Sequence, residues 1–166
     1  MTEKAIEVLS NNPKGYILVV EGGLIDYAHH RGHARKALDE TVAFSDAIET
    51  ALKKTNSRKT LIIVTSDHAH SMVFSGYASR GRNILGTFAQ KSEIDNTSYT
   101  SLLYGTGGPN NYQYSIVNNT VLRLNPIMND TKSFDYSQQA AVLTDEVTHG
   151  GSDVLVYAKG KHIYLK

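Results

Sequence analysis

The sequence predicts an α/β fold, made of part of a three-layer core around a parallel sheet and of an irregular, partly β insertion. Residues 16–20 and 60–65 are apolar and rich in β-branched side chains, which is typical of strands buried on both faces of a parallel sheet. A long helical pattern separates these runs, and the order strand, helix, strand indicates a βαβ unit. Residues 153–158 form a third apolar run and are predicted to be another core strand.

The helical elements follow from apolar residues that recur every three or four positions. Residues 2–9 predict a short amphipathic helix, which the turn at 11–15, with its Asn, Pro and Gly residues, brings to an end. Residues 28–54 carry one apolar stripe and, on the opposite face, oppositely charged pairs at i, i+4, such as Arg35 and Asp39. We interpret the charged side as a solvated face, so this stretch predicts a long amphipathic helix.

Between the second and third apolar runs the composition changes. Gly, Asn, Ser and Tyr dominate residues 76–147, helical periodicity disappears, and short runs such as 99–104 predict strands. The glycine-rich run 105–111 predicts a turn or loop, because it lacks the Lys-Ser/Thr pair of a phosphate-binding loop. We therefore divide the chain into part of a core at 1–75, an insertion at 76–147 and a core strand within 148–166, all belonging to one larger domain.

Composition excludes several classes of protein. With 17 basic and 16 acidic residues the formal net charge is +1, which gives no electrostatic basis for binding nucleic acid. The chain has no cysteine, so a thiolate zinc site and a disulfide framework are both excluded. No apolar run approaches the roughly 20 residues of a membrane span, and no secretory signal begins the chain. Sequons at Asn96, Asn118 and Asn129 mildly favour a glycoprotein, although polar loops of this kind occur in any compartment.

Carboxylate and histidine side chains follow the ends of the predicted strands. Residues 21–30 come directly after the first strand, and Asp26 and His30 share one face if this segment is helical. The second strand runs into Ser-Asp-His-Ala-His at 66–70, and His149 precedes the third strand beside two glycines. Because open α/β sheets bind ligands at the carboxyl ends of their strands, and mixed oxygen and imidazole ligands suit zinc, these clusters predict a zinc site.

The same clusters form three ordered motifs. Residues 21–30 read Glu-x-x-x-Ile-Asp-x-x-x-His, residues 65–70 read Thr-x-Asp-His-x-His, and residues 148–151 read Thr-His-Gly-Gly. In these motifs the chain resembles animal-type alkaline phosphatases, and shorter matches such as Leu-Leu-Tyr-Gly at 102–105 lie between them. The resemblance covers nearly the whole chain. It implies a C-terminal fragment that holds part of the family's three-layer core and a crown-like insertion.

The resemblance also implies a site with two zinc ions and one magnesium ion. Carried over position by position, the ligands are Asp26, His30 and His149 for the first zinc, Asp67 and His68 for the second zinc, and Glu21 for magnesium. His70 matches a histidine that supports a carboxylate ligand of the first zinc, an outer partner of the kind that orients ligands. His29 and His33 match no ligand and are expected to be structural, and His162 is expected to be a surface residue.

By the same resemblance the expected activity is hydrolysis of phosphomonoesters through a phosphoserine intermediate. The expected context is a homodimer that is extracellular or at the cell surface, held to the membrane only through a lipid anchor that this chain does not contain. The family's Asp-Ser nucleophile motif is absent, since no Asp-Ser pair occurs in the sequence. The chain therefore contains no catalytic serine, and we expect it to be inactive alone.

Two other interpretations remain open. One is a non-catalytic zinc-binding fragment that uses only the first-zinc ligands. The other is a metal-dependent phosphodiesterase, sulfatase or mutase of the same superfamily, although the Thr-His-Gly-Gly motif at 148–151 favours a phosphatase.

Overall fold

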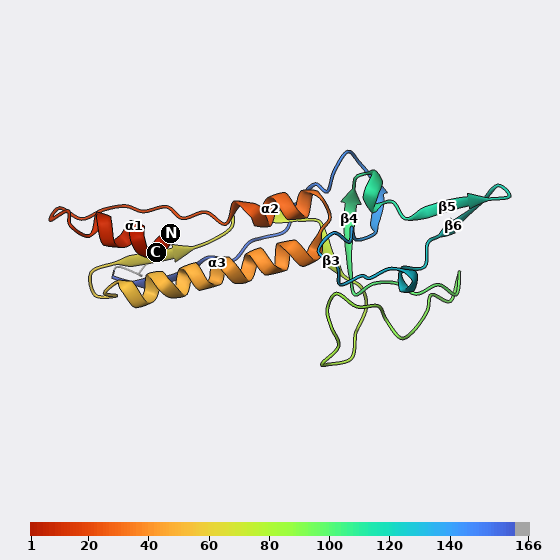
Figure 1. The fold of residues 1–166 in the computed structure, drawn as a ribbon, viewed down its shortest axis with the longest axis horizontal. Helices are drawn as coiled ribbons and strands as arrows, with labels where there is room; N and C mark the ends of the chain where they lie inside the picture. The colour runs from red at the N-terminus through yellow and green to blue at the C-terminus, as the bar shows by residue number, and fades with distance from the viewer. Residues whose placement is uncertain (162–166) are drawn as a thin grey trace.

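A computed structural model describes residues 1–161, so His162 lies outside the described part of the chain. The fold is mixed α/β, as the sequence predicts, and Figure 1 shows helices α1, α2 and α3 at one end and most strands at the other. In chain order the elements are α1 (Thr2–Leu9), α2 (Gly23–His30), α3 (Ala34–Lys54), β1 (Leu61–Val64), β2 (Ala69–His70), β3 (Met72–Phe74), β4 (Leu102–Gly107), η1 (Pro109–Asn111), β5 (Tyr114–Val117), β6 (Thr120–Arg123), η2 (Pro126–Met128), β7 (Ala140–Leu143), β8 (His149–Gly150) and β9 (Tyr157–Gly160).

The predicted helix over residues 28–54 is two helices, α2 and α3, separated by a three-residue break. The amide of His33 donates to the carbonyl of Ala28 at 3.0 Å, and the amide of Gly32 donates to the carbonyl of His29 at 2.7 Å. This pair of bonds is the Schellman pattern that ends a helix, and it requires a left-handed residue. Gly32 supplies that conformation with φ 68°. The prediction of a continuous helix was wrong because the spacing of apolar residues does not reveal a single left-handed residue that ends a helix.

The helical layer packs through small residues and carries ion pairs on its outer face. Ala34 and Ala37 of α3 are fully buried. Arg35 and Asp39 form the predicted i, i+4 pair at 3.0 Å. Lys54, at the end of α3, pairs with Glu3 of α1. The first of these pairs is half-exposed, so it contributes at most about 1 kcal/mol, and apolar packing holds the layer together.

The predicted parallel strand at residues 16–20 is not formed within the described residues. Ile17 and Val19 are 92% and 86% exposed, and β1 pairs instead with β9, antiparallel, with Leu61 opposite Gly160. A strand needs a partner about 4.8 Å away. Residues 16–20 and β1 instead line an apolar groove of about 270 Å³ together with residues of α3. Residues 16–20 have the apolar composition of a sheet strand but form no strand pairing among the described residues.

The predicted core strand at residues 153–158 also differs from the structure. The strand begins only at Tyr157, and Leu155 and Val156 are 70% and 62% exposed without a sheet partner. β9 continues to Gly160, whose φ of 130° is a backbone conformation that residues with a Cβ rarely adopt. Pairing with β1 therefore sets the position of this strand, rather than the limits of the apolar run.

A second sheet, in the order β3-β4-β7, holds the main core. β3 and β4 are antiparallel, whereas β4 and β7 are parallel. Leu102 and Tyr104 of β4 are fully buried and form one apolar cluster with Ala140, Val147 and Ala34 of α3. The core thus joins the helical layer to the strands between residues 102 and 147.

β4 extends into the glycine-rich run that the sequence predicts as loop. Gly107 is its last residue, and a Cβ there would lie 2.6 Å from Asn111 Cβ and 2.7 Å from Ala140 Cβ. Glycine at 107 therefore serves close packing of the backbone against η1 and β7. The prediction of a loop over the whole of 105–111 was wrong, because a strand with glycine at close contacts resembles a turn in composition.

Strands β5 and β6 form a hairpin that projects at the end of the molecule far from α1 (Figure 1). Asn118 and Asn119 at its tip have φ values of 48° and 60°, as a tight hairpin turn requires. Arg123 of β6 binds both carboxylate oxygens of Asp95 at 2.9 Å and also donates to the carbonyl of Ser98 at 2.6 Å. Arg123 therefore ties the base of the hairpin to the loop that precedes β4.

This pairing predicts a low pKa for Asp95. The hydrogen bond from Arg123 is the largest influence and holds the pKa at about 2, below the ordinary value of 3.8. Because the folded pKa is depressed, the pairing stabilises the fold above pH 3.8 and is lost as the pH falls through about 2. In Arg123→Gln the Asp95 pKa should rise toward 3.8, as measured by carboxyl ¹³C NMR titration. Arg82→Gln, which removes an arginine without contact to Asp95, should leave it unchanged; an unchanged pKa in Arg123→Gln would disprove the pairing.

Candidate metal centre

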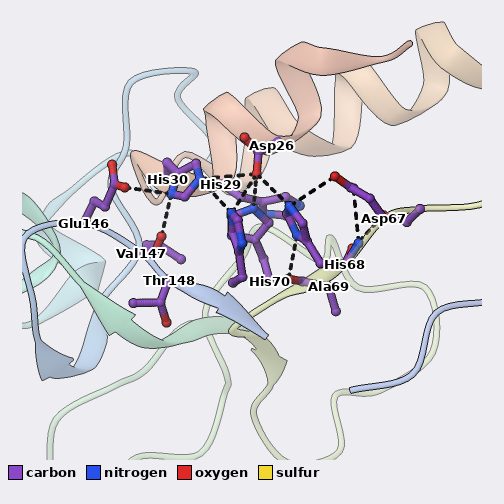
Figure 2. Close-up of polar contacts among 12 residues, drawn as sticks. Asp26, His29, His30, Asp67, His68, Ala69, His70, Glu146, Val147 and Thr148 are labelled. Atoms are coloured by element: carbon purple, nitrogen blue, oxygen red, sulfur yellow. Dashed lines mark hydrogen bonds and ion pairs between the residues drawn. The ribbon is translucent and has the colours of Figure 1, made fainter. Parts of the chain in front are cut away.

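Three segments bring imidazole rings to one carboxylate. Helix α2 carries Asp26 and, one turn later, His30. Strands β2 and β8 pair antiparallel in a register that places His70 opposite His149. Figure 2 shows Asp26 pointing from its helix into the group of imidazoles. Chain positions more than a hundred residues apart therefore meet in one cluster.

Asp26 Oδ1 is the common partner of the cluster. It lies 2.6 Å from His70 Nε2 and 3.3 Å from His30 Nε2. It also lies 3.5 Å from His149 Nε2 and 3.7 Å from His68 Nε2. Asp26, His68, His70 and His149 each offer a ligand atom, and these atoms all lie within 4.8 Å of one another. The cluster thus gathers carboxylate and imidazole donors of the kind that bind zinc.

Three of these atoms have the spacing of neighbouring ligands on a tetrahedral ion. Asp26 Oδ1, His30 Nε2 and His149 Nε2 are separated by 3.3, 3.5 and 3.1 Å. Ligand bonds of 2.0–2.1 Å at tetrahedral angles place ligand atoms about 3.3 Å apart. His70 is different, because its 2.6 Å approach to Asp26 is a hydrogen-bond distance. The donor set of Asp26, His30 and His149 therefore fits one zinc ion, with His70 hydrogen-bonded to the carboxylate from outside.

Backbone carbonyls determine which nitrogen of two rings is free. His30 Nδ1 lies 2.8 Å from the carbonyl of Val147 and 3.3 Å from Glu146 Oε1, as Figure 2 shows. His68 Nδ1 lies 3.1 Å from the carbonyl of Ala69. A carbonyl can only accept, so Nδ1 carries the proton in both rings and Nε2 keeps its lone pair. This is the arrangement by which metal-ligating histidines are oriented in proteins.

Burial and hydrogen bonding shift the pKa values of Asp26 and of the two rings behind it, His70 and His29. Burial acts to raise the pKa of Asp26, but the hydrogen bond from His70 and the charges of the surrounding imidazoles lower it, and the net shift is downward. Burial lowers the pKa of His70, against the opposing influence of Asp26. Burial also lowers the pKa of His29 to about 4. Near pH 7 the carboxylate is therefore ionised and these two rings are neutral.

Hydroxyl groups hold the segment that carries His149. The amide of Thr148 donates to Thr106 Oγ1 at 2.9 Å, and the two threonine hydroxyls lie 2.8 Å apart. Thr106 Oγ1 in turn lies 3.0 Å from Ser71 Oγ. These contacts link the start of β8 to β4 and to the end of β2. Thr148 opens the Thr-His-Gly-Gly motif, but its contact with Thr106 was not predicted, because the two residues lie 42 positions apart.

Asp67 lies beside the cluster, next to His68, which belongs to it. Asp67 Oδ2 is 3.5 Å from His68 Nε2, and the Asp67 side chain is 86% exposed. The ring of His68 stacks on that of His149, with centroids 3.5 Å apart and planes 16° apart. Asp67 and His68 could thus supply two donors to a second ion next to the first.

Glu21 is not brought into the cluster. It lies before the start of α2 and is exposed. Among the described residues it belongs to no group of side chains close enough together to hold a metal ion. Its carboxylate lies against the backbone of the next turn, where a Cβ on Gly23 would be 3.2 Å from Glu21 Oε1. A magnesium site at Glu21 stays a prediction from the resemblance alone.

Two residues behind the cluster, His29 and Tyr104, were not predicted to belong to the site. His29 Nδ1 lies 2.8 Å from the hydroxyl of Tyr104, and its ring stacks on His70. Tyr104 is fully buried, and burial raises its pKa. The Leu-Leu-Tyr-Gly match at 102–105 was the sequence signal for Tyr104, and the alternating burial of β4 shows that its side chain points inward.

Comparison with known proteins identifies the family of this chain. The family model described as "Alkaline phosphatase" matches residues 1–165, so the chain belongs to the alkaline phosphatase family. It is 45% identical to the cat tissue-nonspecific alkaline phosphatase, and 42% identical to the human and chicken ones. Each match covers 165 residues, which is 99% of the chain. The chain spans about 30% of the length of these relatives.

Proposed function

We propose that the chain supplies part of the metal centre of a phosphomonoester hydrolase that uses two zinc ions and one magnesium ion. In this proposal Asp26, His30 and His149 hold the first zinc, and His70 orients Asp26. The observation that carries the proposal is the spacing of 3.1–3.5 Å among Asp26 Oδ1, His30 Nε2 and His149 Nε2. The remaining ligands in the proposal are Asp67 and His68 for the second zinc and Glu21 for magnesium.

The chain's own groups perform defined tasks in such a site. The carbonyl of Val147 fixes the tautomer of His30, and the hydrogen bond from His70 holds the ionised carboxylate of Asp26 in one orientation. Pairing of β2 with β8 sets the position of His149. Zinc bound by these groups supplies Lewis-acid stabilisation of a phosphoryl group and lowers the pKa of water. The attacking serine of the family's phosphoserine intermediate has no counterpart in this sequence, which contains no Asp-Ser pair.

The wider setting is proposed from the family. It comprises a phosphomonoester substrate, a homodimer, a cell-surface or extracellular location with a lipid anchor, glycosylation, and a three-layer core that contains a parallel sheet. Residues 16–20 and β1 line an open apolar groove. Apolar segments of this composition are typical of a buried sheet, so they support such a core. No helix among residues 1–161 is both long enough and apolar enough to span a bilayer.

A chimera tests the proposed function. Residues 1–165 replace the matching segment of the human tissue-nonspecific enzyme, to which they are 42% identical. We expect zinc-dependent hydrolysis of p-nitrophenyl phosphate, lost in the chimera with His149→Ala. His33→Ala, which removes a histidine outside the cluster, serves as the matched control. Preference for bis-p-nitrophenyl phosphate or p-nitrophenyl sulfate would instead assign a phosphodiesterase or sulfatase.

Zinc binding by the chain alone can be tested separately from catalysis. Its donors for the first zinc form a complete set of three, whereas Asp67 and His68 provide only two for the second. We predict that the 166-residue chain binds one zinc ion, measured by competition with a chromogenic chelator, and hydrolyses no p-nitrophenyl phosphate. Loss of zinc in His149→Ala but not in His33→Ala would support this. Zinc-dependent turnover by the chain would contradict the expectation that a serine outside it is required.

A further inference from the structure

We infer that Tyr104 and His29 are positioning residues for the metal centre: together they form a buried support that fixes the ring of His70 and, through it, the carboxylate of Asp26. The inference rests on the proposed function for its zinc readout. Three consecutive contacts define the support. The Tyr104 hydroxyl meets His29 Nδ1 at 2.8 Å, the rings of His29 and His70 stack at 4.8 Å and 25°, and His70 Nε2 meets Asp26 Oδ1 at 2.6 Å.

His70 depends on packing because it has few polar partners. Its side chain is only 5% exposed, and its Nδ1 has no hydrogen-bond partner among the described residues. Its hydrogen bond to Asp26 fixes one end of the ring and leaves rotation about that bond free. The rings around it must therefore set its plane.

Of those rings, His29 alone is not a candidate ligand, whereas the rings that backbone carbonyls hold, His30 and His68, are. The rings of His30, His68 and His149 lie 4.8–5.4 Å from His70, but each of them is itself a candidate ligand. His29 instead meets Tyr104, which lies in the apolar cluster with Leu102 and Ala140. The support thus connects the donor set to the most deeply buried part of β4.

Either atom could be the donor in the contact between Tyr104 and His29, and we assign the Tyr104 hydroxyl as the donor. A hydrogen bond to Nδ1 in which the hydroxyl donates leaves the proton of the neutral ring on Nε2. Without the hydroxyl, His29 can exchange tautomers and change its tilt against His70. A wrongly tilted His70 would hold Asp26 in an orientation that no longer matches His30 and His149.

Tyr104→Phe tests the inference, because it removes one oxygen and keeps the packed ring. We expect zinc affinity, measured by chelator competition on the full chain, to fall about 3–10-fold, less than the roughly 10–100-fold usual for a group bonded directly to a ligand, because Tyr104 acts through His29 and His70. Tyr136→Phe is the matched control, since Tyr136 is a partly buried tyrosine whose hydroxyl donates to Gln113 Oε1 at 3.2 Å. The control should lose a comparable hydrogen bond and keep wild-type zinc affinity.

Two further measurements separate positioning from general stability. His29→Phe keeps a flat ring against His70 but removes the acceptor, so its effect and that of Tyr104→Phe on zinc affinity should be non-additive in the double variant. In the metal-free chain, ¹⁵N NMR should show the Nε2–H tautomer of His29 in wild type, and altered His29 and His70 ring signals in Tyr104→Phe. Unchanged His70 signals, or a zinc affinity equal to that of Tyr136→Phe, would overturn the inference. If wild type binds no zinc, the proposed function fails, and the metal-free spectra still decide this inference.

Discussion

Gly150→Ala should reduce zinc affinity by about 100-fold, at the upper end of the range for groups that orient ligands, because it separates the two strands that carry His70 and His149. A Cβ at position 150 would lie 2.6 Å from the carbonyl oxygen of His70 and 2.8 Å from its carbonyl carbon. Both atoms belong to the backbone, so no side chain can rotate to make room. Relief requires β2 and β8 to move apart, and the facing pair His70 and His149 would separate with them. Chelator competition on the full chain measures the change.

Gly151→Ala provides the control for this prediction. A Cβ on this neighbouring glycine would have open space within 4 Å, and the residue does not have a positive φ. Its replacement should leave zinc affinity within about twofold of wild type, since nothing near it must shift. If Gly150→Ala and Gly151→Ala bind zinc equally well, the β2–β8 pairing does not determine the geometry of the donors.

Gly32→Ala should lower the free energy of unfolding by about 2–5 kcal/mol, through two separate costs. The left-handed conformation, φ 68°, costs a residue with a Cβ about 1–2 kcal/mol. The new methyl would also lie 2.7 Å from Cγ of Asn111, and overpacking of this kind costs about 1–3 kcal/mol. Asn111 is 2% exposed and donates to the carbonyl of Gln138 at 2.8 Å, so it cannot move away freely. Urea unfolding followed by circular dichroism measures the loss.

Gly81→Ala isolates the first of these costs. Gly81 has φ 82° but nothing within 4 Å of a Cβ, so its replacement should cost only about 1 kcal/mol. A difference between the two variants reports the clash with Asn111. Equal losses would show that the junction of α2 and α3 can relax around an added methyl group.

The local patterns predict the elements well where neighbouring residues alone decide the structure. The apolar stripe of residues 28–54 predicts α3, with Arg35 and Asp39 paired on its outer face. The i, i+4 spacing of Asp26 and His30 places both side chains on one face of α2. Helical contacts of this kind span one turn, so the chemical identities of a few residues determine them.

Strand pairing could not be predicted in the same way. Residues 16–20 and 60–65 have nearly the same composition, yet only the second contains a strand, and its partner β9 runs antiparallel. A strand is completed by hydrogen bonds to a segment distant in sequence. Composition therefore indicates the tendency of a segment to form a strand, and the presence of a partner decides whether the strand forms. The parallel arrangement in the described residues belongs to β4 and β7, inside the region predicted to be an insertion.

For the candidate site, the order of residues specifies the donors: carboxylates and imidazoles in three motifs, which suit zinc and characterise the family. Their arrangement comes from the fold. His30 and His149 lie 119 positions apart in the sequence, so the distance between their rings depends on how the chain between them folds. The fold places Asp26 at the centre of the imidazoles, leaves Glu21 outside, and sets His29 and Tyr104 behind His70. Residue types carry the chemistry of a ligand, whereas the angles and distances that make several ligands into one site come from packing between distant segments.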